Sequence, residues 1–326
     1  MNSLPRLAAV AIICAVAGCG DDHLSAEGRT LLRVGHFPNV THAQGLVAHG
    51  LARAGKGWFE ERLGPDVEIE WMVYDAGPSA MEGLLSRTLD LTYVGPSPAV
   101  NAHVKAKGTD IRVVAGAARG GAALVVQGDG RIAAPADFRG RTIATPQLGN
   151  TQDVACRAWL TENGFHVTQT GGDVIVLPTQ NPDQLALFQK GDLDAVWTVE
   201  PWVSRLEREA RGKVFLEEKD ALTTVLVASS PFLEKRPDLA RRFVAAHAEL
   251  TQWIAANPAE AQRLVREEFR AETKKDMPAE LLAHCWPRLR FDTSVDAGAF
   301  DSFVRSAQAA GFLRDAGDVS RIVSVP

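Results

Sequence analysis

The chain has 326 residues and a formal net charge of −5, and 46% of its residues are hydrophobic. This length is more than one hydrophobic core usually serves, so two lobes are expected. The acidic balance and the lack of a basic tail or patch argue against nucleic acid as a partner.

Residues 1–18 have the pattern of a bacterial secretory signal. They carry one charge, Arg6, and then an apolar run over residues 7–17 that is too short to span a bilayer. The run ends in Val16-Ala17-Gly18-Cys19, which resembles a lipobox and so implies that Cys19 is lipidated. Residues 19–30 are expected to form a tether. The body is therefore predicted to lie in the periplasm or at the cell surface, held to the membrane by its lipid anchor only.

The first part of the body alternates between strand and helix patterns. Strands are predicted at residues 31–35, 67–73, 90–94, 111–117 and 122–127. Helices are predicted at residues 43–54, 78–87 and 99–107. Two of these strands run directly into polar loops that open helices, namely His36-Phe37-Pro38-Asn39-Val40-Thr41-His42 and Gly95-Pro96-Ser97-Pro98.

The same alternation continues in the middle of the chain. Strands are predicted at residues 141–145, 173–177, 194–198 and 223–229. Helices are predicted at residues 151–160, at 182–190, and from Glu200-Pro201-Trp202 to about residue 210. Beyond residue 231 the pattern is nearly all helical, with helices at 237–256, 258–269, 278–288 and 296–310. The alternation predicts an α/β fold with a mostly parallel, doubly wound sheet.

Residues 141–160, RTIATPQLGNTQDVACRAWL, are predicted to form a strand, a loop and a helix. Ligands of open α/β sheets bind beyond the carboxyl ends of strands, where the free N–H groups of a helix start favour an anion. Asn150 or Thr151 would cap the helix, and Gly149 would let the backbone approach a ligand closely. An ordinary capped helix is the alternative for this stretch taken alone.

One segment of the chain echoes another, because residues 80–96 can be laid over residues 184–200. The matched pairs are Met81 with Leu185, Leu84 with Phe188, Leu89-Asp90 with Leu193-Asp194, and Tyr93 with Trp197. The echo suggests two lobes of like construction that face each other. Chance similarity between two strand–helix units is the alternative.

Five motifs in this order and spacing resemble the periplasmic substrate-binding proteins of ABC importers of the nitrate, sulfonate and taurine class. They are Val34-Gly35-His36-Phe37-Pro38-Asn39, residues 89–98, residues 144–151, Gly191-Asp192-Leu193-Asp194-Ala195 and Glu200-Pro201-Trp202. The likeness covers about residues 31–256. It implies a two-lobed α/β fold, type II periplasmic-binding-protein-like, with a hinge of two crossing strands. Lobe 1 would comprise residues 31–118 plus 224–326, with its helical C-terminal part packed on it, and residues 119–223 would form the inserted lobe 2.

The resemblance and the helix starts together suggest which residues bind the solute. Asn150 and Thr151 would donate to an anionic head from lobe 2, and Ser97 from lobe 1. The remaining candidates are His36, Asn39, Thr41 and His42 in the first loop, Gln44 in the following helix, and Trp202 against the apolar part of the solute. Glu200 either accepts from an ammonium or hydroxyl group of the solute, pairs with Arg119 at the hinge, or caps its own helix.

The resemblance implies a monomeric solute-binding component of an ABC importer, with a permease and its ATPase as partners. The solute would be a small anion or zwitterion, an aliphatic sulfonate or taurine first and a nitrate-type ion next. Bicarbonate and a thiamine precursor would also fit. The alternatives are a sensor that signals to a histidine kinase, or an enzyme on the same fold, such as a desulfinase with a cleft cysteine or an enzyme acting on pyrimidine or quinone precursors.

The cysteines and histidines suggest no cofactor. Cys156 and Cys285 are expected to be buried free thiols, although a disulfide between them is the alternative in an oxidising compartment. His36, His42 and His49 are spaced six and seven residues apart and could bind a metal, but an importer of zinc would want ligands from both lobes, so no metal is expected. Cys156 is the thiol candidate for the enzyme alternative, and a packed apolar role suits it better.

Overall fold

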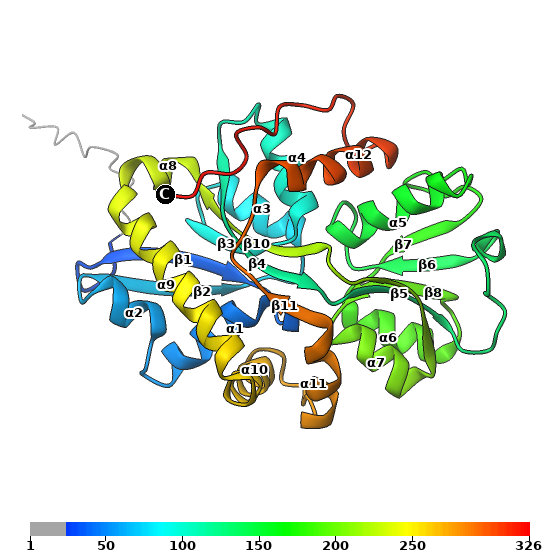
Figure 1. Ribbon diagram of the computed structural model, residues 1–326, viewed down its shortest axis with the longest axis horizontal. Coiled ribbons are helices and arrows are strands. Elements are labelled where there is room, and N and C mark those ends of the chain that lie inside the picture. Colours follow the sequence, from blue (N-terminus) through cyan, green and yellow to red (C-terminus); the bar gives the residue numbers. More distant parts are fainter. Residues whose placement is uncertain (1–23) are drawn as a thin grey trace, which may run out of the picture.

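The computed structural model describes residues 24–326, so the predicted signal peptide and the lipidation of Cys19 lie outside the described residues. Two α/β lobes, each built around its own sheet, lie side by side along the long axis of the molecule (Figure 1). Among residues 24–326, no helix is both long and apolar enough to cross a membrane.

The larger sheet belongs to the first lobe. Its strands are β1 (Thr30–His36), β2 (Val67–Val73), β3 (Leu91–Val94), β4 (Ile111–Gly120), β10 (Leu222–Ser229) and β11 (Leu289–Phe291). They lie in the order β11-β4-β10-β3-β1-β2. The smaller sheet has the strands β5 (Ala122–Gln127), β6 (Thr142–Thr145), β7 (Ile175–Pro178), β8 (Ala195–Val199) and β9 (Gly212–Glu218). Their order is β7-β6-β8-β5-β9.

Helices cover both faces of the larger sheet. The helices over one face are α1 (Ala43–Arg53), α2 (Trp58–Leu63), α8 (Ser230–Lys235), α9 (Pro237–Ala256), α10 (Pro258–Thr273) and α11 (Ala279–Cys285). The helices over the other face are α3 (Gly77–Leu85), α4 (Pro96–Lys105) and α12 (Asp301–Ala309). Short 3-10 turns lie at Val40–His42, Pro135–Phe138, Trp286–Arg288 and Ala297–Phe300. The C-terminal helices thus pack on the first lobe, as predicted.

The smaller sheet is also sandwiched between helices. Helix α5 (Thr151–Glu162) packs on one face, and α6 (Asn181–Lys190) and α7 (Trp202–Ala210) pack on the other. The four apolar cores therefore come in pairs, two for each sheet. Four helices and strands among the described residues are not predicted from the sequence, namely α2, α8, β9 and β11.

The prediction of a mostly parallel sheet is wrong. Strand β1 is parallel to β2 and β3, and β6 is parallel to β7 and β8. However, β10 is antiparallel to β3 and β4, β11 is antiparallel to β4, and β5 is antiparallel to β8 and β9. The reason is the course of the chain, because the strand that leaves a lobe lies beside the strand that returns to it.

Two crossings of the chain connect the lobes. Strand β4 leads through Gly121 into β5, and residues 219–221 lead from β9 into β10. The crossings lie next to each other, since the Gly120 nitrogen donates to the Ala221 oxygen at 2.9 Å. Gly120 has a φ of 73°, and a Cβ there would lie 2.6 Å from the Lys219 oxygen. The close approach of the two crossings therefore needs glycine at this position.

The internal echo corresponds to equivalent structure in the two lobes. Asp90 follows α3, and its carboxylate accepts from the Arg33 nitrogen of β1 at 2.8 Å. Asp194 follows α6, and its carboxylate accepts from the Thr142 nitrogen of β6 at 2.9 Å. Each aspartate also donates its own N–H to the carbonyl of that same residue. The Leu-Asp pair of each copy therefore fixes a helix against the central parallel strand of its lobe.

Candidate functional site

A small cavity lies where the carboxyl ends of strands from both sheets face each other. It contains roughly 400 Å³ of space not filled by atoms, including its opening. The polar lining residues are Asn39, Thr41, His42, Asp75, Asn150, Gln152, Asn181 and Thr223. They follow β1 and β2 in the first lobe, β6 and β7 in the second, or belong to β10. We call this space the inter-lobe cavity, and it lies at the kind of strand edge where α/β sheets bind ligands.

The predicted residues Asn39, Thr41, His42 and Asn150 all line the inter-lobe cavity. Trp202 lines a second pocket further out, which shares Asn39 with the cavity. Glu272, at the end of α10, lines that outer pocket too. The two strand-end loops singled out from the sequence, one in each lobe, therefore meet in one place.

The orientation of the cavity amides follows from hydrogen bonds with backbone and indole donors. The Trp202 Nε1–H donates to Asn39 Oδ1 at 3.0 Å, and the Asp153 N–H donates to Asn150 Oδ1 at 2.8 Å. Because these donors need oxygen acceptors, the Asn39 amide presents its NH₂ group, and Asn150 Nδ2 donates to Gln152 Oε1 at 3.3 Å. The NH₂ groups of Asn39 and Gln152 have no hydrogen-bond partner among residues 24–326.

The cavity offers N–H donors without a basic side chain. None of the lining residues that the structure describes is Lys or Arg, and the charged one is Asp75, which is exposed. His42 is buried and stacks on Phe37 with ring centroids 4.2 Å apart. Burial, together with the nearby His36, holds the pKa of His42 well below its ordinary value, so its ring is neutral near pH 7. Its Nδ1 is buried with no partner, so a solute group can satisfy it.

Hydrogen bonds around the cavity join the two lobes. The Val40 nitrogen donates to the Glu200 oxygen at 3.1 Å, and the Trp202 Nε1–H reaches Asn39 as described above. The Ser97 nitrogen, in the first turn of α4, donates to Thr151 Oγ1 at 3.3 Å. The lobes are therefore in contact along the cavity, in a closed arrangement. Ser97 and Thr151 thus meet each other, while the Ser97 Oγ is buried without a partner.

Seven of the predicted binding residues do not line the inter-lobe cavity. Ser97 and Thr151, which were predicted to donate to the anion, lie beside it and contact each other. Trp202 lines the outer pocket, Glu200 is described below, and the other three point elsewhere. Gln44 Nε2 donates to the Ala117 oxygen at 2.8 Å inside the first lobe. Arg119 lies at the hinge, where its Nε is 3.7 Å from a carboxylate oxygen of Asp292. His36 turns toward His49 and Glu272. A position next to a strand end does not decide which way a side chain points, and for these residues the partners come from elements far along the chain.

Glu200 is fully buried and has protein partners for both carboxylate oxygens. Oε2 accepts from the Ser204 nitrogen at 3.1 Å, so Glu200 caps α7, as one alternative had it. Oε1 accepts from Ser204 Oγ at 2.9 Å and from Arg288 Nη1 at 2.9 Å. The alternative that paired Glu200 with Arg119 is therefore wrong. Arg288 is the partner because its 3-10 turn lies against α7.

Sequence reasoning missed four polar lining residues. Thr223 belongs to β10 and Gln152 to α5, and the other two follow the outer strands of the two sheets. Asp75 comes after β2, and Asn181 is the first residue of α6 after β7. Ligands lie beyond the ends of these strands as well. The polar residues that follow the predicted strands at 67–73 and 173–177 could therefore have been predicted to line the site. Gln152 lies one residue after the predicted Thr151.

A buried ion pair supports the loop that carries Asn150. Asp153 Oδ2 accepts from the Gly149 nitrogen at 2.9 Å, and Oδ1 accepts from Thr145 Oγ1 at 2.8 Å. Arg157 Nε lies 3.1 Å from Asp153 Oδ2, and both side chains are almost fully buried. The pair fixes the end of β6, the loop and the helix start relative to each other.

The prediction of two buried free thiols at Cys156 and Cys285 is confirmed. Cys156 lies in an apolar core of the second lobe together with Leu160 and Phe165. Burial raises the pKa of both thiols, so neither forms a thiolate near neutral pH. The enzyme alternative that relied on Cys156 therefore lacks a nucleophile at this position.

Residues 25–267 match a family model described as the NMT1-like family. The taurine-binding periplasmic protein of Escherichia coli is 27% identical over 196 residues, which cover 58% of this chain and 58% of that relative. A Bacillus subtilis protein, provisionally named an aliphatic sulfonates-binding protein, is 26% identical over 253 residues, which cover 75% of this chain and 72% of that protein.

Solved structures with the same fold include two binding proteins. One is the alkanesulfonate-binding protein SsuA of Xanthomonas axonopodis pv. citri, solved with MOPS bound, with a TM-score of 0.73 at 17% identity over 90% of this chain and 98% of that one. The other is the nitrate-binding protein NrtA of Synechocystis PCC 6803, with a TM-score of 0.71 at 16% identity over 90% of this chain and 85% of that one. The predicted periplasmic-binding-protein-like fold is confirmed.

Proposed function

The chain belongs to the NMT1-like family, and from that premise we propose that it is the solute-binding component of an ABC importer. Its solute is a small anion or zwitterion, with an organic sulfonate such as taurine as the first choice and a nitrate-type ion as the second. The relatives named for taurine and aliphatic sulfonates support this choice. Bound between the lobes, the solute stabilises the closed form that a permease recognises.

The observation that carries the proposal is the set of unpartnered donors in the inter-lobe cavity. The NH₂ groups of Asn39 and Gln152 line a cavity without Lys or Arg, next to the start of α5. Neutral donors and a helix start can replace the hydration of a sulfonate or nitrate oxygen. They form no ion pair with it, because no Lys or Arg lines the cavity among the described residues.

Asp75 supports the zwitterion over a simple anion. This carboxylate lies at the border between the inter-lobe cavity and the outer pocket, and it would repel a bare anion. A solute with an ammonium group a few bonds from its sulfonate can place the sulfonate on the amides and the ammonium near Asp75. Sequence reasoning offered this acceptor role to Glu200 as one of three alternatives, but the oxygens of Glu200 are already used by Ser204 and Arg288.

The remaining parts of the proposal concern the assembly around this chain. The partners are a permease and its ATPase, the chain acts as a monomer, and the lipid on Cys19 is its membrane attachment. The lobes are residues 31–118 plus 224–326 and residues 119–223, so that closure occurs about the two crossings. Capture and presentation, without turnover, are the proposed activity.

Isothermal titration calorimetry with a matched set of solutes tests the function. Taurine, ethanesulfonate and nitrate share an oxyanion, but taurine alone adds an ammonium group. We expect taurine to bind most tightly, and we expect Asp75→Asn to remove its advantage over ethanesulfonate. Asp66→Asn, which changes another exposed aspartate of the first lobe, is the matched control and should leave all three affinities unchanged.

Two results would contradict the proposal. The solute-binding role fails if none of these solutes binds, and the zwitterion preference fails if ethanesulfonate binds as tightly as taurine in the unchanged protein. Release of an inorganic sulfur oxyanion during incubation with a sulfonate or a sulfinate would instead identify an enzyme.

A further inference from the structure

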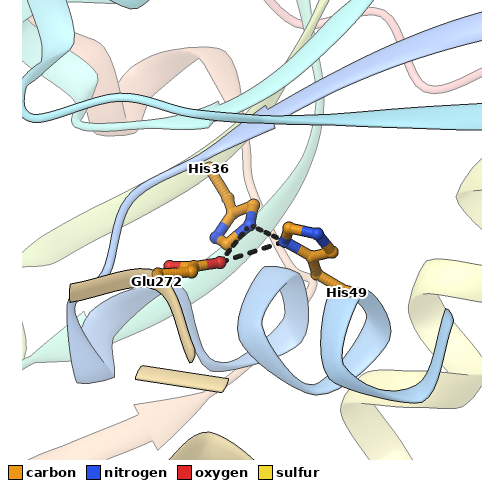
Figure 2. A group of neighbouring side chains, drawn as sticks. All are labelled: His36, His49 and Glu272. Carbon is orange, nitrogen blue, oxygen red and sulfur yellow. Dashed lines mark hydrogen bonds and ion pairs between the residues drawn. The ribbon is translucent and has the colours of Figure 1, made fainter. Parts of the chain in front are cut away.

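Outside the inter-lobe cavity, the first lobe holds a compact cluster of two histidines and a glutamate. His36 ends β1, His49 lies in α1, and Glu272 lies in the last turn of α10. Figure 2 shows the two imidazole rings and the carboxylate converging on one point. We propose that His36, His49 and Glu272 bind a divalent transition-metal ion of the zinc class.

The spacing of the three ligand atoms suits a zinc ion. His36 Nε2 is 3.1 Å from His49 Nδ1, and each of these nitrogens is 3.0 Å from Glu272 Oε1. A tetrahedral zinc ion at about 2.0–2.1 Å from each ligand atom sets neighbouring ligand atoms roughly 3.3 Å apart. The atoms therefore need to separate by only about 0.3 Å to bind the ion. Two histidines and one carboxylate are a zinc ligand set that leaves the fourth position to water.

Hydrogen bonds alone do not satisfy this triangle. The Arg53 guanidinium is 3.2 Å from His49 Nε2 and can only donate, so a neutral His49 carries its proton on Nδ1. If His36 Nε2 also carries a proton, both N–H groups point at Glu272 and the two nitrogens face each other without an acceptor. If His36 Nε2 carries none, its lone pair faces the Glu272 oxygen. One contact of the three is unfavourable in either case, whereas a cation uses all three lone pairs.

Unpartnered atoms in the cluster are a second, independent observation. Glu272 Oε2 and His36 Nδ1 are buried without a hydrogen-bond partner, although the side chains of Glu272 and His36 are only 3% and 0% exposed. Buried polar atoms nearly always have partners. Glu272 Oε2 can bind the cation as well as Oε1, which makes the carboxylate bidentate and fills the fourth position in place of water.

The surroundings favour a cation and leave it a path. Glu268 Oε1 lies 2.7 Å from Arg53 Nη2 and 3.2 Å from His49 Nδ1, so a second carboxylate adds negative charge beside the cluster. A surface groove lined by Arg53 and Trp71 reaches His49, and the outer pocket reaches Glu272. When a metal takes His49 Nδ1, the His49 proton moves to Nε2 and Arg53 must turn away. Its side chain is 52% exposed, so it can do so while it keeps Glu268.

The backbone makes room for this arrangement at one glycine. A Cβ on Gly45 would lie 2.6 Å from the His36 Cβ and 2.9 Å from its Cγ. Glycine at this position therefore lets the His36 ring lie against α1, one turn before His49. The metal would tie the end of α10 to the end of β1, directly before the loop that lines the inter-lobe cavity. The proposed site differs from the expectation of no metal that the sequence suggests. Its third ligand is Glu272, whereas the sequence placed His42 beside His36 and His49.

Metal titration of the chelator-treated protein, made without a histidine tag, tests the site. We expect one Zn²⁺ per chain by calorimetry, and Co²⁺ should give the visible absorption of a four-coordinate ion. Glu272→Gln and His49→Gln each keep the size of the side chain and should weaken Zn²⁺ binding by at least about tenfold. His166→Gln, which changes an exposed histidine of the second lobe, is the control and should bind as the unchanged protein does.

Some outcomes would overturn the site. The first is that the unchanged protein neither binds Zn²⁺ nor gives the Co²⁺ absorption. The second is that Glu272→Gln and His49→Gln, shown to be folded by circular dichroism, bind Zn²⁺ as tightly as the unchanged protein. If a ligand variant fails to fold, the Co²⁺ absorption of the unchanged protein decides alone. Taurine affinity reports separately on the inter-lobe cavity, so a failure of either proposal leaves the other testable.

Discussion

The substitution Asn150→Asp separates the two tasks of Asn150, which caps α5 and takes part in the donor set of the cavity. Its Oδ1 accepts from the Asp153 nitrogen at 2.8 Å, and a carboxylate can accept in the same way. Asn and Asp are about equally good helix caps, and a negative charge suits a helix start, so stability should change by less than about 0.5 kcal/mol.

Binding should respond very differently from stability. The new carboxylate removes the Nδ2 donor and draws the Gln152 NH₂ group toward itself, away from the solute. At about 5 Å and an effective dielectric constant of about 20, two like charges repel by roughly 3 kcal/mol. We therefore expect the affinity for a sulfonate to fall by at least about a hundredfold, which is about 2.7 kcal/mol.

Calorimetry and urea unfolding on the same sample provide the assay. Asn150→Ala is the comparison, because it removes both functions. It should lose about 1 kcal/mol of stability together with about 1–3 kcal/mol of binding. An Asn150→Asp variant that is folded and binds the sulfonate with unchanged affinity would refute the placement of the anion at this helix start.

Three further predictions test other parts of the structure. Asp153→Asn leaves the buried Arg157 without its ion-pair partner and should cost about 3–5 kcal/mol in urea unfolding, while a loss below 1 kcal/mol would mean that the pair is dispensable. Burial lowers the pKa of His247 to about 4, so below about pH 6.5 the unfolded chain binds more protons than the folded protein. The free energy of unfolding should therefore fall by up to about 3 kcal/mol as the pH drops to 4. His247→Gln should flatten this pH dependence in urea unfolding, and an unchanged pH dependence would contradict the assignment. Trp202→Phe removes the bond to Asn39 across the lobes and should weaken taurine binding by about 0.5–1.5 kcal/mol in calorimetry, whereas unchanged affinity would exclude a role of that bond in closure.

The sequence was sufficient to predict two of the loops that line the inter-lobe cavity. Loops after β1 and β6 carry polar residues between a β-branched run and a helix, and this pattern led to Asn39, Thr41, His42 and Asn150. Local periodicity and turn residues decide such elements, so a single chain is enough to find them. The Leu-Asp echo was informative for the same reason, because it records one local unit used twice.

Side-chain partners could not be predicted in this way. Glu200 pairs with Arg288, which lies 88 residues along the chain, and His49 meets Glu272 across 223 residues. Nothing near Glu200 in the sequence favours Arg288 over Arg119, because the choice depends on how a C-terminal turn packs against α7. The antiparallel pairing of β10 likewise depends on the return of the chain from the second lobe.

A crystal structure of the protein grown with taurine tests the central claim most directly. The account predicts density for the sulfonate in the inter-lobe cavity, with its oxygens within hydrogen-bonding distance of the amides of Asn39, Asn150 or Gln152, and with the ammonium group toward Asp75. An empty cavity at saturating taurine, or a sulfonate bound outside the contact between the two lobes, would contradict it.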